Sequence, residues 1–238
     1  MKKFIFLLLF IIMLTLSCSS YSPINSIKSE LNRFPEYTII LQDMKEEGNF
    51  FPSYYHRYKI IYKDNTETSE TPTYRTFITG WYDVKKGMYR DFNNFLGMTV
   101  ASKTQDGTIS NTNHPPGYQY VGNQRYGQWR NDSSGNSFWE FYGKFAMLNA
   151  AFSMFRRPIY RSNYNDYRRH SSSGRPFYGS NREYGTSGSQ TKQNNKSFFQ
   201  RRKARDLARK SRFRNRIGQR VRRSNMSGYR SRSFGFGK

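Results

Sequence analysis

The segment YYHRYKIIYK, residues 54–63, alternates between two kinds of side chain along its length. One side of an extended chain here carries Tyr58, Ile60 and Tyr62, and the other side is largely basic. Because successive side chains of a β-strand point to opposite faces, this period of two predicts a strand with one apolar face. Such a face needs a second layer of structure to cover it, and the rest of the chain must supply that layer.

Strand patterns recur on both sides of this segment, with short polar turns between them. Gly48-Asn49 and Asp106-Gly107 are turn signals, and the second is typical of a hairpin. Gly80 interrupts the longest run and predicts a bulge or a close backbone approach. Since short links join consecutive strands, we expect an antiparallel sheet in meander order. The further strands are expected at residues 37–42, 73–84, 95–103 and 108–111.

A short amphipathic helix is expected before the first strand. Ser22 and Pro23 suit the N-cap and the first helical position, and Pro35 ends the pattern. The apolar residues between these points recur at helical spacing and predict one buried side of the helix. They are Ile24, Ile27, Leu31 and Phe34.

Residues 137–157 predict a second, longer helix. Ser137 and Glu140 have the spacing of a capping box, and Pro158 ends the segment. The pattern favours a core helix that covers the sheet, and a membrane-lying helix near the anchor is the alternative. The expected fold class is therefore α+β, a small antiparallel sheet (β-meander) packed by an aromatic-rich helix. The apolar stripe spans about 80° of that helix and consists of Phe141, Phe145, Leu148, Phe152 and Phe155.

Residues 114–129 contain prolines, glycines, amides and aromatic rings without a period, which predicts a long irregular loop. Exposed Tyr and Trp side chains beside Asn and Gln can stack on sugar rings or bind a protein partner. The alternative, which we favour, is that these rings fill the domain's own core. The possible ligand surface comprises Tyr118, Tyr120, Tyr126 and Trp129.

The net charge of +24 is concentrated at one end of the chain. Residues 1–155 hold 16 Lys and Arg against 13 Asp and Glu, whereas residues 156–238 hold 24 against 3. The first part is long enough for one domain. The second is too charged and too poor in apolar residues to condense without an anionic partner. Its Gly-Ser run and its lack of a period predict a flexible linker over residues 159–196.

Residues 197–223 regain a helical pattern inside this basic tail. Arginine presents a fork of donors that matches phosphate and carboxylate, so lipid headgroups, cell-wall or surface polymers and nucleic acid all fit as partners. A solvated tail without a dedicated partner is the alternative, and residues 224–238 are expected not to fold. An apolar sector of about 120° consists of Phe199, Leu207, Phe213, Ile217 and Val221. The candidate polyanion-binding residues gather on another side of the helix: Arg201, Arg202, Arg205, Arg209, Arg212, Arg216, Arg220 and Arg223.

Residues 1–18 have the layout of a secretory signal. Two lysines precede an apolar run over residues 4–14, which is too short for a transmembrane helix. Leu16-Ser17-Cys18 resembles the lipobox of bacterial lipoproteins, although that family favours leucine where this chain has Thr15. The resemblance implies cleavage before Cys18 and its diacylation. In that family, an aspartate directly after the cysteine directs retention in the inner membrane. This chain has Ser19 at that position, so the resemblance implies the outer membrane in a bacterium that has one. An ordinary cleaved signal and an uncleaved anchor helix are the alternatives.

No arrangement of residues in the sequence predicts catalysis. His56, His114 and His170 lie in three different segments, and no pair has the spacing of metal ligands. Cys18 is assigned to the signal and is not a nucleophile candidate, and Asp43, Glu46 and Glu47 suit a solvated turn. We therefore expect no enzyme activity, no cofactor and no metal. An active site assembled from the aromatic loop and the sheet stays open, because geometry rather than spacing defines a site.

The sequence thus predicts an exported, lipid-anchored protein of a bacterial cell envelope. The membrane is reached through the lipid anchor, and anionic envelope material through the basic tail. A nucleic-acid-binding protein that acts through the tail is the alternative. The expected parts are a signal peptide (1–17), a tether (18–21), an α+β domain (22–158), an Arg/Tyr/Gly/Ser-rich linker (159–196) and the basic tail (197–238).

Overall fold

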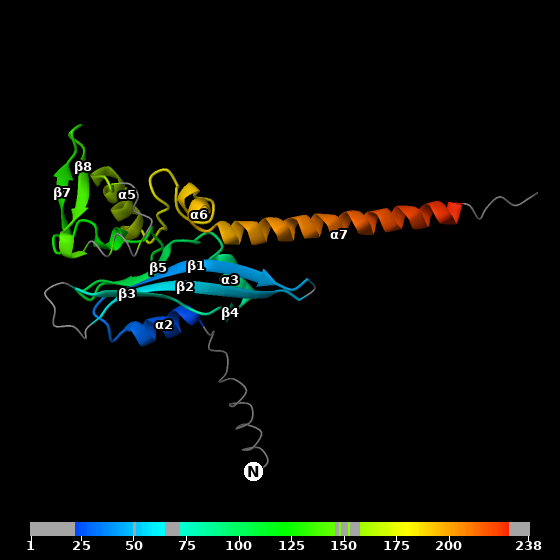
Figure 1. Cartoon of the computed structure of the whole chain (residues 1–238), viewed down its shortest axis with the longest axis horizontal. Coiled ribbons are helices and arrows are strands. Elements are labelled where there is room, and N and C mark those ends of the chain that lie inside the picture. The colour runs from blue at the N-terminus through cyan, green and yellow to red at the C-terminus, as the bar shows by residue number, and fades with distance from the viewer. Residues whose placement is uncertain are drawn as a thin grey trace, which may run out of the picture. The chain divides into compact units, whose positions relative to one another are not determined.

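The computed structural model describes residues 22–49, 51–64, 72–145, 148, 152 and 158–228, with side chains through residue 221. The predicted signal and the lipidation site at Cys18 lie outside the described residues. The chain divides into two compact units, Met1–Gln193 and Asn194–Lys238, which are described separately (Figure 1). Among the described residues, no helix combines the length and the apolar composition that crossing a membrane requires.

The first unit is built on a six-stranded antiparallel sheet (Figure 1). Its central hairpin consists of β1 (Tyr37–Glu47) and β2 (Ser53–Lys63), and the chain turns between them at Gly48, whose φ is +88°. A left-handed backbone at this position suits glycine, as the predicted turn requires. The other strands are β3 (Tyr74–Ile78), β4 (Tyr82–Val84), β5 (Thr99–Lys103) and β6 (Ile109–Ser110).

The strand order is β3-β2-β1-β5-β6, and β4 also pairs with β2. β3 and β4 are the two parts of the predicted strand 73–84, and Gly80 lies in the break between them. After α3 (Lys86–Asp91) the chain returns to the other edge of β1, so the order departs from a simple meander at this one connection. The predicted α+β class and its antiparallel sheet are confirmed.

β1 is buried on both of its faces. Thr38 and Ile40 alternate with Ile39 and Leu41 along the strand, and none of the four is more than 2 % exposed. The predicted first helix, α2 (Pro23–Leu31), lies over one face of the sheet with its apolar side chains buried (Figure 1). Later segments of the unit lie over the opposite face. The central strand of this sheet therefore needs two covering layers.

Residues 137–141 form a strand rather than the start of the predicted helix. β7 (Gly127–Asn131) pairs with β8 (Ser137–Phe141) in a separate two-stranded sheet. Trp129 and Trp139 lie directly opposite each other, with their ring centroids 5.1 Å apart. Cross-strand aromatic pairs of this kind stabilise a hairpin. The prediction of a capped helix beginning at Ser137 is wrong.

The turn between these two strands explains why the capping-box spacing predicted the wrong element. The Asp132 carboxylate accepts hydrogen bonds from the backbone N–H groups of Ser134 and Asn136, at 2.9 and 2.8 Å. Such a turn folds the backbone back before residue 137. Glu140 then accepts a charged hydrogen bond from Arg130 across the hairpin, at 2.7 Å, instead of capping a helix.

The apolar stripe of the predicted helix is nevertheless buried in the core. Phe145, Leu148 and Phe152 are at most 5 % exposed, and they pack in one cluster with Ile40 and Ile61 of the sheet. The core interpretation is confirmed for these three side chains, and their burial contradicts the membrane-lying alternative. The last member of the stripe, residue 155, lies outside the described residues.

Residues 159–196 are folded, so the prediction of a flexible linker is wrong. They contain α5 (Arg161–Ser172) and α6 (Ser189–Asn194). Tyr167 and Phe177 are 8 and 3 % exposed, and they join a second apolar cluster with Trp139. The aromatic rings of this segment supply the buried area that its scarcity of aliphatic residues concealed.

The second unit consists mainly of one helix, α7 (Lys196–Gly228). It confirms the helix predicted for residues 197–223 and extends five residues into the stretch expected not to fold. Residues 229–238 lie outside the described part of the chain.

We expect Gly127→Ala to destabilise the first unit. A Cβ added to Gly127 would collide with the backbone oxygen of Glu140 on the paired strand. Overpacking of this kind costs about 2 kcal/mol, and the free energy of unfolding in a denaturant titration should fall by that amount. Gly87→Ala is the control, because a Cβ at Gly87 meets no heavy atom within 4 Å. An equal loss of stability in both variants would contradict the steric explanation.

Candidate functional site

α7 is a continuous helix because its sequence is rich in good helix formers and contains no proline. At 1.5 Å per residue, its 33 residues extend for about 50 Å. Thirteen of these residues are Lys or Arg, and Asp206 is the only acidic one. The helix is therefore a long cationic surface, and it is the strongest candidate site in the described part of the chain.

The arginines of α7 form a nearly straight stripe. Seven of them advance by four, four and three residues, twice over, which averages about 3.67 residues per step and nearly matches the helical turn. Successive guanidinium groups thus leave the helix on one side, about 4.5 to 6 Å apart along its axis. The stripe consists of Arg201, Arg205, Arg209, Arg212, Arg216, Arg220 and Arg223, and Arg202 lies beside it.

The described side chains of this stripe are largely in solvent. Arg205 is partly buried and the others through residue 220 are exposed, whereas the side chain of Arg223 is not described. Arg212 Nε donates a hydrogen bond to the carbonyl oxygen of Ala208, at 3.2 Å, one turn back along the helix. Like charges one turn apart repel each other. A row of anions along this side would remove that repulsion while it accepts the guanidinium hydrogen bonds.

The rings proposed as a ligand surface are mostly inside the first unit. Tyr118, Tyr120 and Tyr126 are at most 3 % exposed. Trp129 is half-buried between the rings of Trp139 and Tyr164, whose centroids lie 5.1 and 5.6 Å away. Burial of the three tyrosines contradicts an exposed stacking surface and agrees with the alternative that the segment fills the core.

An aromatic row that the sequence analysis did not single out is partly exposed on the sheet. The rings of Phe34 and Tyr62 lie 4.3 Å apart, and those of Tyr62 and Phe77 lie 6.2 Å apart. Phe77 is 46 % exposed, and the Arg33 guanidinium lies 4.9 Å from the Phe34 ring centroid. The alternation along residues 54–63 indicated this face, but it did not indicate that part of it stays uncovered.

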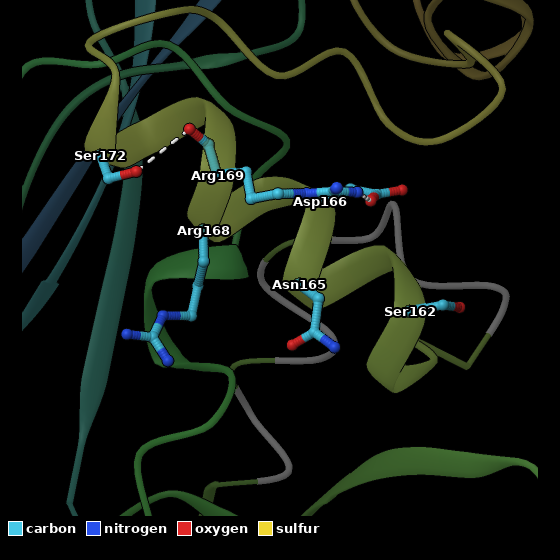
Figure 2. Close-up of a pocket in the computed structure, with 6 residues that line it drawn as sticks. All are labelled: Ser162, Asn165, Asp166, Arg168, Arg169 and Ser172. Atoms are coloured by element: carbon cyan, nitrogen blue, oxygen red, sulfur yellow. Dashed lines mark hydrogen bonds and ion pairs between the residues drawn. The ribbon is translucent and has the colours of Figure 1, made fainter.

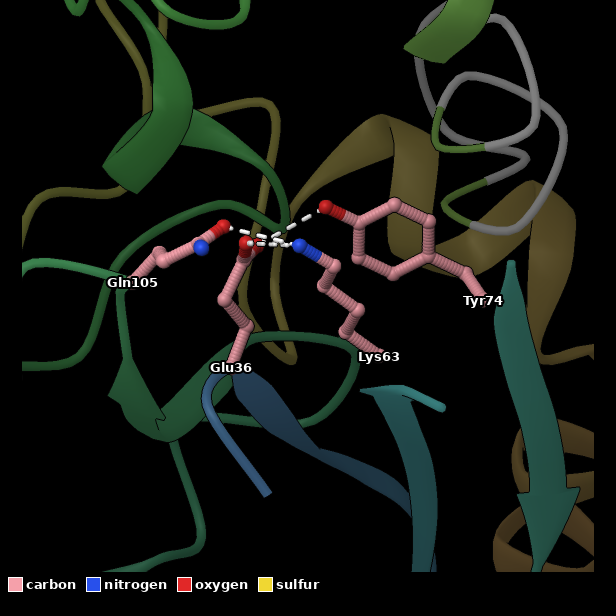
Figure 3. A network of polar contacts seen from close by, with 4 residues as sticks. All are labelled: Glu36, Lys63, Tyr74 and Gln105. Atoms are coloured by element: carbon pink, nitrogen blue, oxygen red, sulfur yellow. Dashed lines mark hydrogen bonds and ion pairs between the residues drawn. The ribbon is translucent and has the colours of Figure 1, made fainter. Parts of the chain in front are cut away.

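Glu36 forms a buried polar cluster at the start of β1, and the sequence analysis missed it. Figure 3 shows the cluster, in which Tyr74 Oη donates a hydrogen bond to Glu36 Oε2 at 2.8 Å. Lys63 Nζ lies 3.9 Å from Glu36 Oε1 and donates to Gln105 Oε1 at 2.9 Å. A single acid before an apolar strand gives no pattern that distinguishes burial from exposure, so no sequence signal could have found it.

Burial governs the protonation of this cluster. Desolvation raises the pKa of the Glu36 carboxyl, and the hydrogen bond from Tyr74 and the charge of Lys63 oppose that rise. Desolvation and, to a smaller extent, the charge of the Glu36 carboxylate raise the pKa of the Tyr74 and Tyr126 hydroxyls well above the usual range. Since the carboxyl is fully buried, the cluster is better suited to join β1, β2 and β3 than to react with a ligand.

Two of the three histidines are also buried. His56 Nδ1 lies 3.1 Å from Tyr58 Oη, and His114 Nδ1 donates to the carbonyl oxygen of Pro115 at 2.9 Å. Desolvation lowers the pKa of each imidazole to about 4. No group of three or more His, Cys, Asp or Glu side chains is placed to hold a metal ion within the part of the chain that the structure describes.

A shallow polar depression of about 680 Å³ runs along α5 (Figure 2). Asp166 is ion-paired with Arg169, and Ser172 Oγ donates to the Arg169 carbonyl oxygen at 3.1 Å. The depression is open to solvent and lies on one helix face, so it offers little enclosure for a small ligand. It is lined by Ser162, Asn165, Asp166, Arg168, Arg169 and Ser172.

Comparison of the chain with models of protein families, with curated protein sequences and with solved structures finds no match. The assignment of α7 as the candidate site rests on its charge, its periodicity and its exposure.

We expect the first unit to lose stability as the pH falls from about 6.5 to about 4, because His56 and His114 must stay neutral when folded. The unfolded state binds more protons than the folded state in that window, so its free energy drops on acidification. At pH 5 the loss amounts to about 2 kcal/mol for each imidazole. Denaturant titrations at pH 7.5 and at pH 5 measure this loss in the wild type and in His114→Gln. The free energy of unfolding of the variant should fall less from pH 7.5 to pH 5 than that of the wild type.

Glu36→Gln is the control of opposite sign. A carboxyl with a raised pKa is most favourable to the folded state at low pH, and its contribution falls as the pH rises above about 4.5. The stability of Glu36→Gln relative to the wild type should therefore improve with rising pH. The assignment of the pH dependence to buried groups fails if neither substitution changes its slope.

Proposed function

We propose that the chain is an exported, lipid-anchored protein of a bacterial cell envelope that binds anionic envelope material through α7. Cys18 would hold its α+β domain at the membrane, and the arginine stripe would hold a second, anionic surface. The observation that carries the proposal is the stripe itself, with its guanidinium groups repeated on one side of a helix about 50 Å long. The role is binding and structural rather than catalytic.

The spacing of the stripe suits a partner with many anionic groups in a row. Each guanidinium can form two parallel hydrogen bonds with a phosphate or a carboxylate. Steps of about 4.5 to 6 Å allow neighbouring arginines to engage neighbouring anions. A single small anion would satisfy one or two arginines and leave the remaining repulsion in place. An extended polyanion or a surface of anionic headgroups therefore fits better than a small-molecule ligand.

Attachment at two points would strengthen a weak helix contact. A lipid anchor at Cys18 confines the chain to the membrane, so α7 meets envelope polyanions at a high effective concentration. The same confinement keeps the helix away from cytoplasmic nucleic acid. This argument depends on the lipobox-like Leu16-Ser17-Cys18, and it makes nucleic acid the second candidate rather than the first.

We expect the arginine stripe to set the affinity for polyanions. Arg205→Gln/Arg212→Gln/Arg216→Gln removes three charges from the stripe and should elute from immobilised heparin at clearly lower salt than the wild type. With about 0.9 counterions released per contact, the slope of log affinity against log salt should become shallower by about three.

A matched control removes the same charge from another side of α7. Lys203→Gln/Lys210→Gln/Arg214→Gln takes away three positive charges that lie away from the stripe on the helical wheel. It should change heparin elution less than the stripe variant does. Equal shifts for the two variants would mean that net charge alone acts. Retention on duplex DNA or RNA to much higher salt than on heparin would favour the nucleic-acid alternative.

We expect Cys18→Ala to abolish both fatty-acid labelling and membrane retention. The thiol is the only one in the chain, so no other cysteine can accept the acyl chains. Metabolic labelling with a radioactive fatty acid, followed by fractionation, compares the two proteins directly. An unlabelled, cytosolic wild type would remove the lipid anchor from the proposal and turn the basic helix into an argument for nucleic acid.

A further inference from the structure

α7 carries a second surface that polyanion binding does not use. Leu207, Phe213, Ile217 and Val221 are 56, 63, 45 and 53 % exposed. Large apolar side chains exposed singly are ordinary, but a contiguous row of them marks an interaction site. Phe213, Ile217 and Val221 follow one another at steps of four residues, so these exposed side chains adjoin along the helix and form a surface that suits an apolar partner.

These side chains share one side of the helix. At about 100° per residue they fall within an arc of about 120°, whose centre lies roughly 130° from the arginine stripe. Lys203, Lys210 and Arg214 lie inside the same arc. Their methylene stems can lie along an apolar surface while their charged ends reach up to anions above it. The arc is therefore apolar close to the helix backbone and cationic where its Lys and Arg side chains end.

We infer that α7 lies along the surface of an anionic lipid bilayer, with its apolar arc buried at the level of the headgroups and its basic residues on lipid phosphates. This inference rests on the proposed polyanion-binding function and names its partner. A helix with a strongly charged face and an apolar face lies in the plane of the interface. Each basic side chain near an anionic leaflet adds to the attraction.

The charge and the apolar arc together argue against two other partners for α7, a dissolved polyanion and a second copy of the helix. A dissolved polymer of sugar phosphates or carboxylates would neutralise the arginines but leave Phe213 and its neighbours in water. A second copy of α7 could cover the apolar arc, but it would bring together two helices that each carry thirteen basic residues and one acidic residue. An anionic bilayer covers the apolar arc and brings lipid phosphates to the basic side chains within it and to Arg209 and Arg220, at the edge of the stripe next to Phe213.

Amide hydrogen exchange of α7 tests this inference in the full chain. The protein is reconstituted into vesicles of phosphatidylcholine alone, or of phosphatidylcholine with phosphatidylglycerol. Whatever holds residues 1–18 to the vesicles is common to both compositions. We expect amides of residues 199–221 to exchange at least tenfold more slowly on the anionic vesicles. The rest of the chain should exchange equally on the two.

Leu207→Gln/Phe213→Gln/Ile217→Gln removes the apolar arc and keeps every charge. Glutamine is as good a helix former as these residues or a better one, so loss of helicity does not confound the result. The variant should lose most of the protection on anionic vesicles and keep its heparin elution. The control, Ala204→Gln/Ala208→Gln/Asn215→Gln, changes a third side of the helix and should keep both properties.

Two results would overturn the inference and leave the proposed function standing. One is full protection of the apolar-arc variant on anionic vesicles, which would mean that charge alone holds the helix there. The other is a wild type that binds heparin but gains no protection on anionic vesicles. If the wild type neither binds heparin nor gains protection, the proposed function fails together with the inference.

Discussion

The burial of β1 on both of its faces is the constraint on which the rest of the first unit depends. Its edges are satisfied by hydrogen bonds to β2 and β5, but its faces need two covering layers. One layer, α2, comes from before the sheet. The other comes from side chains that follow every strand of the sheet in the chain: Tyr120, Tyr126, Phe145, Leu148 and Phe152. Since neither layer can bury its own apolar side chains without the sheet, the helix, the sheet and the later segments must form together as one cooperative unit.

The same burial encloses Glu36, whose carboxyl cannot be hydrated at the start of β1. An unpaired charge there would cost several kcal/mol. The partners that reduce this cost are Tyr74 of β3 and Lys63 at the end of β2. A slip of one residue between the strands would turn these side chains to the other face and leave the carboxyl without them. We interpret the cluster as a determinant of strand register, which explains why a carboxyl group is buried among aliphatic and aromatic side chains.

Elements with a strong local period could be predicted from the sequence, whereas those decided by competing or distant contacts could not. The alternation of residues 54–63 fits only a strand, and the spacing of the apolar residues in 22–34 fits only a helix. The Ser137–Glu140 spacing fits a capping box, but the Asp132 turn and the Trp129–Trp139 pair, which act across the hairpin, decide for a strand. The return of β5 to β1, the burial of the aromatic loop and the cluster at Glu36 depend on contacts far apart in sequence. For the candidate site, by contrast, a single helix period was enough to place the arginines on one side.

The two units place their aromatic and charged residues in opposite ways, and this difference is the reason that we propose α7 as the binding site. The first unit turns most of its rings inward and holds 24 Lys and Arg against 15 Asp and Glu, whereas the second unit holds 16 against one. α7 exposes both its cations and its apolar arc. A helix with like charges one turn apart is only marginally stable in water, and an anionic surface that binds it also removes the repulsion that weakens it. Binding and helix stability are therefore linked equilibria. Salt acts on both in opposite directions, because it screens the repulsion within the helix and competes for its partner.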